Sequence, residues 1–275
     1  MEYGLGLLIA SINLLRWQRT PENESTNMSD ERWDFYSCNI DGKPHSTMVN
    51  LSLFSDAPID KLSMFHCIAV NLKFPHPEHG MTTDDEYQVL YEMEDFIFEN
   101  QNTELKYIAR QTGDNKRKFY FYASPQADFN SLVESLGSAY PSYEKSTFSF
   151  EDSRWTTYFD DLYPNAMAWN EISNRAVCFR LEEGGDDLNI PRTIDHSIIF
   201  HDKKKMKEFE KTVLEKGFTV EIKKTGFFKK EYDLLVQREN APAELDPITF
   251  ELQDLAERLG GSYDGWGCYQ ATSKE

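Results

Sequence analysis

The last third of the chain alternates strand-like and helix-like segments in a fixed order. In chain order they are a strand at 195–200 (DHSIIF), a helix at 202–217, strands at 218–224 and 232–239, a helix at 247–260 and a strand at 263–270. The order βαββαβ is that of the ferredoxin-like split unit. It predicts an α+β sandwich in which two helices lie against a four-stranded antiparallel sheet.

The ends of the two predicted helices support this pattern. Gly217 follows the first helix and Gly260-Gly261 follows the second, where a helix commonly ends in a left-handed residue that glycine adopts without strain. Both helices repeat apolar residues at helical spacing, so each has one face to bury. We therefore expect both helices on one face of the sheet and the other face free for a partner.

The part of the chain before this unit predicts a second α+β domain. Alternating segments flank the turn Asp41-Gly42, a third strand-like segment follows, and a second hairpin surrounds Gly113-Asp114-Asn115. Asp-Gly between alternating segments is a strong hairpin signal. Helical spacing follows Thr83 and again spans 129–136, and we expect strands at 140–149 and, as a sheet edge, at 155–164 (WTTYFDDLYP). An antiparallel sheet with two helices results.

Length and composition place the boundaries. A chain of 275 residues favours two domains, because a single core rarely grows beyond about 250 residues. We expect an acidic domain of unknown function at 28–165, a linker at 166–191 and the ferredoxin-like domain at 192–275. Within the linker, AVCFRL at 176–181 resembles a strand. Residues 1–27 are expected to be a loose tail or a wrongly assigned start of the chain. The alternative is an amphipathic docking helix in the apolar stretch 3–15, which is too short to span a membrane.

Charge and cysteine usage narrow the class of protein. The net charge is −18, and residues 28–165 account for about −12 of it, with 11 basic and 23 acidic residues. Such a chain opposes polyanions, since nucleic-acid binding depends on neutralising phosphates, so no direct nucleic-acid binding is expected. The four cysteines are scattered and form no CxxC pair, which indicates reduced thiols and a cytoplasmic protein.

Motifs for catalysis are sparse. No dinucleotide-binding GxGxxG, P-loop or GxSxG sequence occurs. His76 and His79, with Glu78 and Asp85 nearby, are the strongest metal candidates, but they lie three residues apart between prolines rather than four apart on a helix. We therefore treat them as weak candidates, favour a polar loop, and expect neither a metal nor another cofactor.

The candidate contact residues lie in the last domain. Asp195 and His196 are adjacent on a predicted strand, so they point to opposite faces and the carboxylate cannot readily orient the imidazole as a general base. The segment GGSYDGW combines a helix end with large amphipathic rings around a tight turn. We expect a partner-binding site made of Asp195, His196, Tyr263, Asp264, Gly265 and Trp266; the alternative for Trp266 is a plug in the core.

These segments carry a family resemblance. DHSIIF, the lysine-rich helix ending in Gly217-Phe218, the strand ending in Gln237-Arg238 and LAERLGGSYDGWGC together resemble the regulator of ribonuclease E activity, B type. Residues 33–171 resemble the uncharacterised bacterial domain that often precedes that regulator. The resemblance implies a ferredoxin-like fold, no catalysis, and binding to the scaffold-bearing part of ribonuclease E. The matching positions, none of them catalytic in the family, are Asp195, His196, Phe200, Gly217, Phe218, Gly260, Gly261, Tyr263, Asp264, Gly265 and Trp266.

The resulting functional hypothesis is a non-enzymatic, protein-binding regulator whose partner is ribonuclease E or its assembly. Two alternatives stay open. One is a metal-dependent or hydrolytic activity in the first domain that uses His76, Glu78, His79 and Asp85. The other is a small-ligand sensor with a pocket between the domains, where pockets commonly form.

Overall fold

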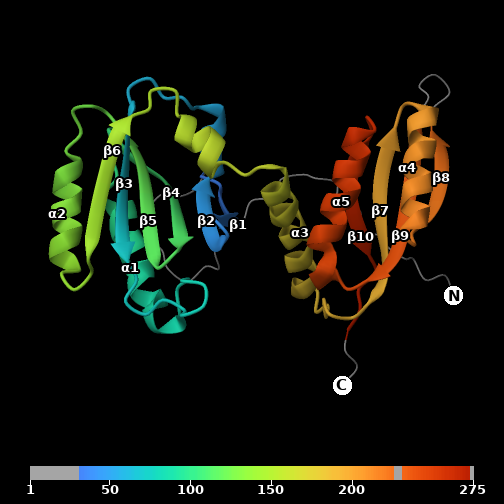
Figure 1. Cartoon of the computed structure of the whole chain (residues 1–275), viewed down its shortest axis with the longest axis horizontal. Helices are drawn as coiled ribbons and strands as arrows, with labels where there is room; N and C mark the ends of the chain where they lie inside the picture. The colour runs from blue at the N-terminus through green and yellow to red at the C-terminus, as the bar shows by residue number, and fades with distance from the viewer. Residues whose placement is uncertain (1–30, 226–230, 273–275) are drawn as a thin grey trace. The chain divides into compact units, whose positions relative to one another are not determined.

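The computed structural model describes residues 31–225 and 231–272, which divide into two compact units that meet in the sequence at Ala168 and Trp169 (Figure 1). Both units combine an antiparallel sheet with helices, so the predicted α+β class is confirmed. The expected tail at 1–27, including the stretch 3–15, lies outside the described residues. No helix within 31–225 or 231–272 is long and apolar enough to cross a membrane.

The N-terminal domain contains a six-stranded sheet of order β1-β2-β4-β5-β3-β6 in which all pairs are antiparallel. Its strands are β1 (Trp33–Ile40), β2 (Lys43–Asn50), β3 (Met64–Asn71), β4 (Leu105–Gly113), β5 (Lys116–Ala123) and β6 (Lys145–Glu151). Both predicted hairpins form, with positive φ at Asp41 and Gly42 in one turn and at Asp114 and Asn115 in the other. Such residues match the right-handed twist of hairpin strands.

One face of this sheet packs against α1 (Asp84–Asn100) and α2 (Phe129–Ala139). Leu90 and Met93 of α1 and Leu136 of α2 are fully buried against Phe119 and Phe121 of β5. The helical spacing of these apolar residues is the pattern that predicted both helices. A short 3-10 turn, η1 (Leu51–Ser55), follows β2.

The edge strand predicted at 155–164 is wrong. Residues Thr157–Leu162 form a single π-helical turn, η2, that lies on the second face of the sheet. Asp152 accepts the backbone N–H groups of Thr156 and Thr157 at 2.9 Å each, so its carboxylate caps a helical turn. Trp155 then stacks on Tyr122 with 3.9 Å between ring centroids, which fixes the segment over the sheet.

The C-terminal domain has the expected ferredoxin-like order (Figure 1). Its sheet has the order β10-β7-β9-β8 and is antiparallel throughout. The elements are β7 (Arg192–Phe200), α4 (Lys203–Glu215), β8 (Thr219–Thr225), β9 (Glu231–Asn240), the 3-10 turn η3 (Pro242–Glu244), α5 (Leu245–Arg258) and β10 (Ser262–Cys268). Gly217 and Gly260 adopt positive φ after their helices, as predicted.

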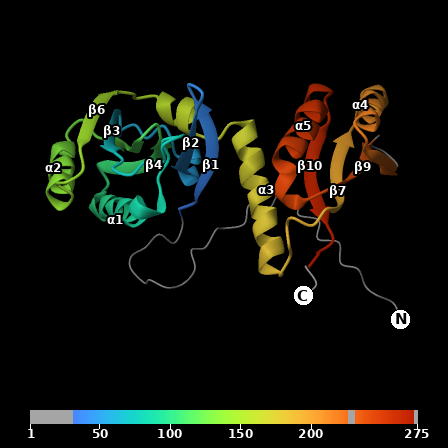
Figure 2. The same cartoon turned by 60° about the horizontal axis from the view of Figure 1, so that its bottom comes forward.

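The strand predicted at 176–181 is wrong, because residues Ala166–Glu183 form helix α3. Most of the segment expected to be a linker is therefore helical. Val177, Cys178 and Leu181 recur at helical spacing and pack against Ile194 of β7 and Leu245 of α5. In a window of six residues this spacing is hard to distinguish from strand alternation. Figure 2 shows α3 beside α5 and β10.

The helices of the C-terminal domain all pack on one face of its sheet. Ile194, His196, Ile198 and Phe200 alternate along β7 and are fully buried on the helix side. The intervening residues of β7 therefore point to the other face, and the same alternation places Asp233, Leu235 and Gln237 of β9 there. We call this second surface of the C-terminal sheet the open face.

Candidate functional site

The Trp266 side chain is part of the core of the C-terminal domain. It is 5% exposed, and its indole Nε1 donates a hydrogen bond of 2.8 Å to Oδ1 of Asn174 on α3. The Asn174 amide donates in turn to Asp246 and Thr249 of α5 at 2.7 Å each. Trp266 thus joins α3, α5 and β10, and the direct contact expected for it does not fit the folded domain, whereas the alternative of a core plug does.

His196 is also sealed inside, where it meets Tyr263. The ring is 0% exposed, and its Nδ1 lies 2.8 Å from the Tyr263 hydroxyl. Burial lowers the pKa of His196 to about 3, with a further contribution from the charge of Arg238, and burial raises the pKa of Tyr263. A neutral imidazole without solvent access is neither a general base for a substrate nor a contact for a partner.

Asp264 is the exposed residue of the YDGW segment, and Gly265 after it is half-buried. The register of β10 against β7 shifts between Tyr263 and Gly265, and Gly265 has a φ of 116°. This irregularity has the features of a β-bulge on an edge strand, which interrupts the row of free backbone groups and discourages pairing with other chains. Asp264 is exposed beside it.

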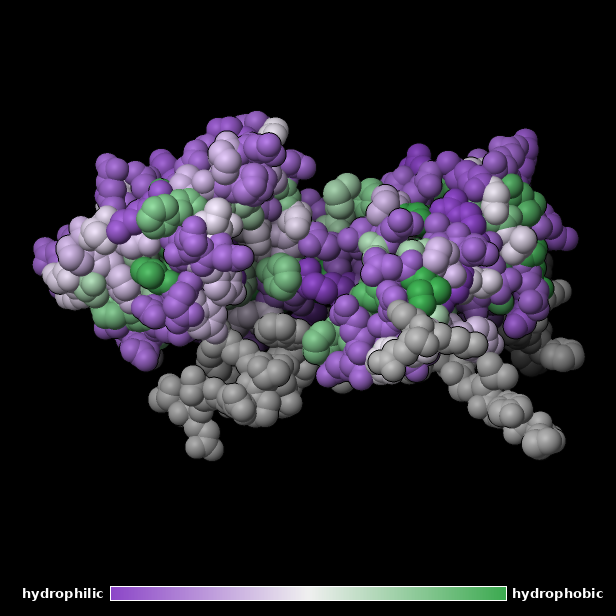
Figure 3. All heavy atoms as spheres, turned by 90° about the horizontal axis from the view of Figure 1, so that it is seen from below, coloured by the Kyte–Doolittle hydropathy of each residue, from purple (hydrophilic) through white to green (hydrophobic). Residues whose placement is uncertain are grey.

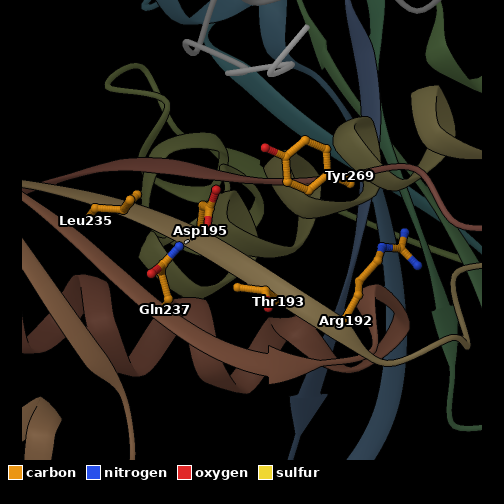
Figure 4. Close-up of a pocket in the computed structure, with 6 residues that line it drawn as sticks. All are labelled: Arg192, Thr193, Asp195, Leu235, Gln237 and Tyr269. Atoms are coloured by element: carbon orange, nitrogen blue, oxygen red, sulfur yellow. Dashed lines mark hydrogen bonds between the residues drawn. The ribbon is translucent and has the colours of Figure 1, made fainter. Parts of the chain in front are cut away.

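Asp195 lies on the open face and lines a pocket of about 550 Å³ (Figure 4). The lining residues come from β7, β9 and the residue after β10; they are Arg192, Thr193, Asp195, Leu235, Gln237 and Tyr269. Gln237 lies opposite Asp195 in the register of β7 and β9, and its Nε2 donates a hydrogen bond of 2.7 Å to Oδ1 of Asp195. The Asp195–Gln237 pair therefore forms the polar floor of this pocket.

Two features of the sheet leave room above this floor. Gly265 and Gly267 of β10 are the neighbours of Ser197 and Asp195 on β7, so the adjoining strand adds no side chain there. Tyr269 is half exposed at the rim. The result is a hollow lined by a carboxylate, an amide, one aliphatic side chain and one aromatic ring, together with Arg192 and Thr193.

The positive charge at the rim of the pocket is already compensated. Arg192 donates from Nη2 to Asp186 at 2.5 Å, from Nη1 to the carbonyls of Asp187 and Ile190, and from Nε to Cys268. The Asp186 carboxylate is itself fully buried. Arg192 therefore fixes the segment between α3 and β7, and its guanidinium has few donors left for a ligand.

Acidic residues dominate the rest of the open face. Alternation places Glu221 of β8 and Glu231, Asp233 and Glu239 of β9 on it, in addition to Asp195. Apart from Arg192 at the rim of the pocket, Lys223 is the one basic residue among the described positions of this face, and it lies 3.8 Å from Glu221. The electrostatic field of this surface favours a cationic partner.

The weak metal candidates His76 and His79 lie in the loop before α1. Their rings stack with 3.7 Å between centroids, and their Nδ1 atoms accept the backbone N–H groups of Glu78 and Met81 at 3.3 Å each. Asp85 belongs to the first turn of α1. Within residues 31–225 and 231–272, no group of three or more His, Cys, Asp or Glu side chains could hold a metal ion.

The face of the molecule that Figure 3 shows is mostly hydrophilic, with small separate hydrophobic patches. Recognition through polar and charged groups suits such a surface better than a broad apolar interface. The sequence analysis named Asp195 as a contact residue but missed Gln237 and Tyr269, which line the pocket with it. The alternation of residues along β9 could have placed Gln237 on this face. Tyr269 follows the last strand, and no sequence pattern indicated its position.

The C-terminal domain is thus a ferredoxin-like sandwich with helices on one face and a hollowed, acidic sheet on the other. Its residues 171–268 match the family model for Regulator of ribonuclease activity B, and residues 31–163 match the Family of unknown function (DUF695). Each match covers less than half of the chain. Together they confirm the resemblance of both domains, and the regulator match begins inside α3 rather than at β7.

Comparisons with whole proteins add little to these domain matches. No curated protein matched the chain. An unknown protein from Galdieria sulphuraria is similar at 10% identity over 75% of this chain and 99% of its own, with a TM-score of 0.24. A putative glycine cleavage system transcriptional repressor is similar at 11% identity over 76% and 98%, with a TM-score of 0.22.

Proposed function

We propose that the protein is a non-enzymatic regulator that binds a ribonuclease, with ribonuclease E as the target. The observation that carries this proposal is the match of residues 171–268 to Regulator of ribonuclease activity B. The open face adds physical support, because no described segment of the C-terminal domain covers it and it carries polar and charged side chains. The four cysteines are free thiols, which fits a reducing compartment such as the cytoplasm.

Asp195 and Asp264 remain the contact residues of the expected site, since both are accessible in the folded domain. We assign the centre of the contact to the open face around Ser197, which lies between Leu235 of β9 and Gly265 of β10. His196, Tyr263 and Trp266 support this surface from the helix side, where they set the position of β7 and β10. These three residues therefore affect binding indirectly, because they hold the strands of the contact surface in place.

The test measures binding of the full chain to purified ribonuclease E and the rate at which that enzyme cleaves a standard RNA. The variant Ser197→Arg places a long cation at the centre of the open face. We expect the unaltered chain to bind and to change the cleavage rate, and Ser197→Arg to weaken binding by at least about tenfold, as a blocked interface centre does.

A matched control carries the same charge change on the helix side. Gln253 is on α5 and bonds only to its helical neighbour Glu257 among the described residues, so Gln253→Arg should bind as the unaltered chain does. Absence of binding and of any effect on cleavage would reject the regulatory role. Equal weakening by both variants would reject the open face as the contact surface.

A further inference from the structure

The pocket around Asp195 has more hydrogen-bond acceptors than donors to offer. Gln237 uses its amide N–H on Oδ1 of Asp195, and no hydrogen bond to Oδ2 of Asp195 or to Oε1 of Gln237 occurs among the described residues. A carboxylate oxygen and an amide oxygen are both acceptors. A ligand with several N–H donors would satisfy them, whereas a phosphate or carboxylate would leave them unpaired.

The remaining wall of the pocket favours a planar cation. Tyr269 is 53% exposed. Figure 4 shows that its ring lines the same hollow as the side chains of Asp195, Leu235 and Gln237. A guanidinium group stacks on an aromatic face and bonds to two acceptors in one plane. Leu235 supplies an apolar surface on which the methylene stem of such a side chain can lie.

The charge balance of the pocket agrees with a cationic occupant. The Arg192 guanidinium is paired with the buried Asp186 carboxylate, so its charge does not neutralise Asp195. Glu239 extends the negative surface, since it lies opposite Thr193 of the pocket in the register of β7 and β9. A partner that presents a positive side chain meets a complementary field over this part of the open face.

We propose that this pocket binds an arginine side chain of the protein partner: Asp195 and Gln237 accept hydrogen bonds from the guanidinium, and Tyr269 stacks on its plane. This inference rests on the proposed function and names the feature of the ribonuclease that the open face recognises. The arginine is an anchor residue, of the kind that fills a pocket and dominates the energy of an interface.

The experiment uses the full chain and three nine-residue probe peptides that alternate serine with arginine, lysine or citrulline. Citrulline has nearly the shape of arginine without its charge. Affinity is measured by fluorescence anisotropy at low and moderate salt, and binding to ribonuclease E is measured in parallel. We expect the arginine peptide to bind at least about tenfold more tightly than the citrulline peptide, and more tightly than the lysine peptide, which lacks the planar fork.

The variants separate the pocket from general electrostatics. Asp195→Asn keeps an acceptor for Gln237 but removes the charge, and it should weaken both the arginine peptide and ribonuclease E by about tenfold or more. Tyr269→Ala should weaken them by about threefold to tenfold. Glu221→Gln removes the same charge from the open face outside the pocket, and its effect should be under about threefold, because an exposed charge beside Lys223 is screened.

The outcomes distinguish this inference from the proposed function. If ribonuclease E binds Asp195→Asn and Glu221→Gln equally, the arginine pocket is rejected while the regulatory role stands. If ribonuclease E does not bind but the arginine peptide does so through Asp195, the pocket stands and the assigned partner is rejected. Binding of free arginine as tightly as the peptide would overturn a docking role in favour of a small-ligand site.

Discussion

The two domains combine the same kinds of elements but treat the second face of the sheet differently. In the N-terminal domain the chain folds back over that face, where Trp155 stacks on Tyr122 and the hydroxyl of Tyr158 donates to the carbonyl of Asn50 at 2.8 Å. In the C-terminal domain the corresponding face is acidic and hollowed at Asp195. None of the described segments of the C-terminal domain covers this face, and that difference is what makes it the proposed interaction surface.

Sequence differences explain the two outcomes. The covered face carries aromatic side chains whose hydroxyls bond internally, such as Tyr36 to the carbonyl of Leu162 at 2.9 Å and Tyr120 to Gln111 at 3.2 Å. The open face carries mainly carboxylates and hydroxyls, which keep their hydration. Burial of aromatic surface is favourable when the polar tips find partners, whereas burial of unpaired carboxylates is costly.

Removal of the cover in the N-terminal domain would break this comparison with a large effect. Trp155 is 0% exposed, and its Nε1 donates to the carbonyl of Leu62 at 2.8 Å. Trp155→Ala should lower the free energy of unfolding of this domain by about 3–5 kcal/mol, since it leaves a cavity and an unpaired carbonyl. The measurement is denaturant unfolding followed by signals of the N-terminal domain.

A control on the same face shows what an uncovered aromatic contributes. Phe148 of β6 is 48% exposed, so Phe148→Ala should cost less than about 1 kcal/mol, because little of its surface leaves water on folding. Similar losses for the two variants would mean that the segment with Trp155 does not act as a cover.

The helix-covered faces of the two sheets resemble each other more closely. They can be compared through the effect of low pH on the stability of each domain. Each buries a histidine: His66 stacks on Phe129 of α2, and His196 lies under the helices of the C-terminal domain. Burial lowers the pKa of both, in the case of His196 to about 3. Below the ordinary value of 6.5 the unfolded chain binds a proton that folded His196 does not, so stability falls as the pH drops from 6.5 towards 3.

The expected size follows from this shift. Between pH 7 and pH 5, His196 should reduce the free energy of unfolding of the C-terminal domain by about 2 kcal/mol. His196→Gln, which can accept from Tyr263, should remove that part of the pH dependence, as measured by urea unfolding at both pH values. An equal pH dependence in the variant and the unaltered chain would contradict the assignment.

The sequence predicted the C-terminal sheet well because its strands alternate cleanly and both helices end in glycine. Prediction from the sequence failed where the tertiary structure decides whether a short segment forms a strand or a helix. AVCFRL became part of α3 because Asn174, one turn earlier, bonds to Trp266 and to α5. No local pattern shows a side chain that pairs with a residue 92 positions away.

Some of the expected contact residues are accessible and others are buried, and the tertiary structure again decides which. Adjacent residues on a strand face opposite sides, so Asp195 and His196 could not both meet a partner, and the alternation already indicated that one of them is buried. Which one it is depends on where the helices lie. The buried side of β10 depends in addition on the irregularity after Tyr263, which changes the parity of the strand and places Trp266 on the helix side.

The smallest expected effect sharpens the comparison most directly. Ser197→Arg on the open face should change the unfolding free energy of the C-terminal domain by less than about 0.5 kcal/mol, since surface substitutions away from buried groups are nearly neutral. Thr47→Arg on the covered face should unfold or severely destabilise the N-terminal domain, because Thr47 is 0% exposed and bonds to Gln111 at 3.1 Å. Both are measured by thermal unfolding of the full chain. A large destabilisation by Ser197→Arg would show that the open face is filled by part of the chain itself, and its loss of ribonuclease binding would then report on folding rather than on contact.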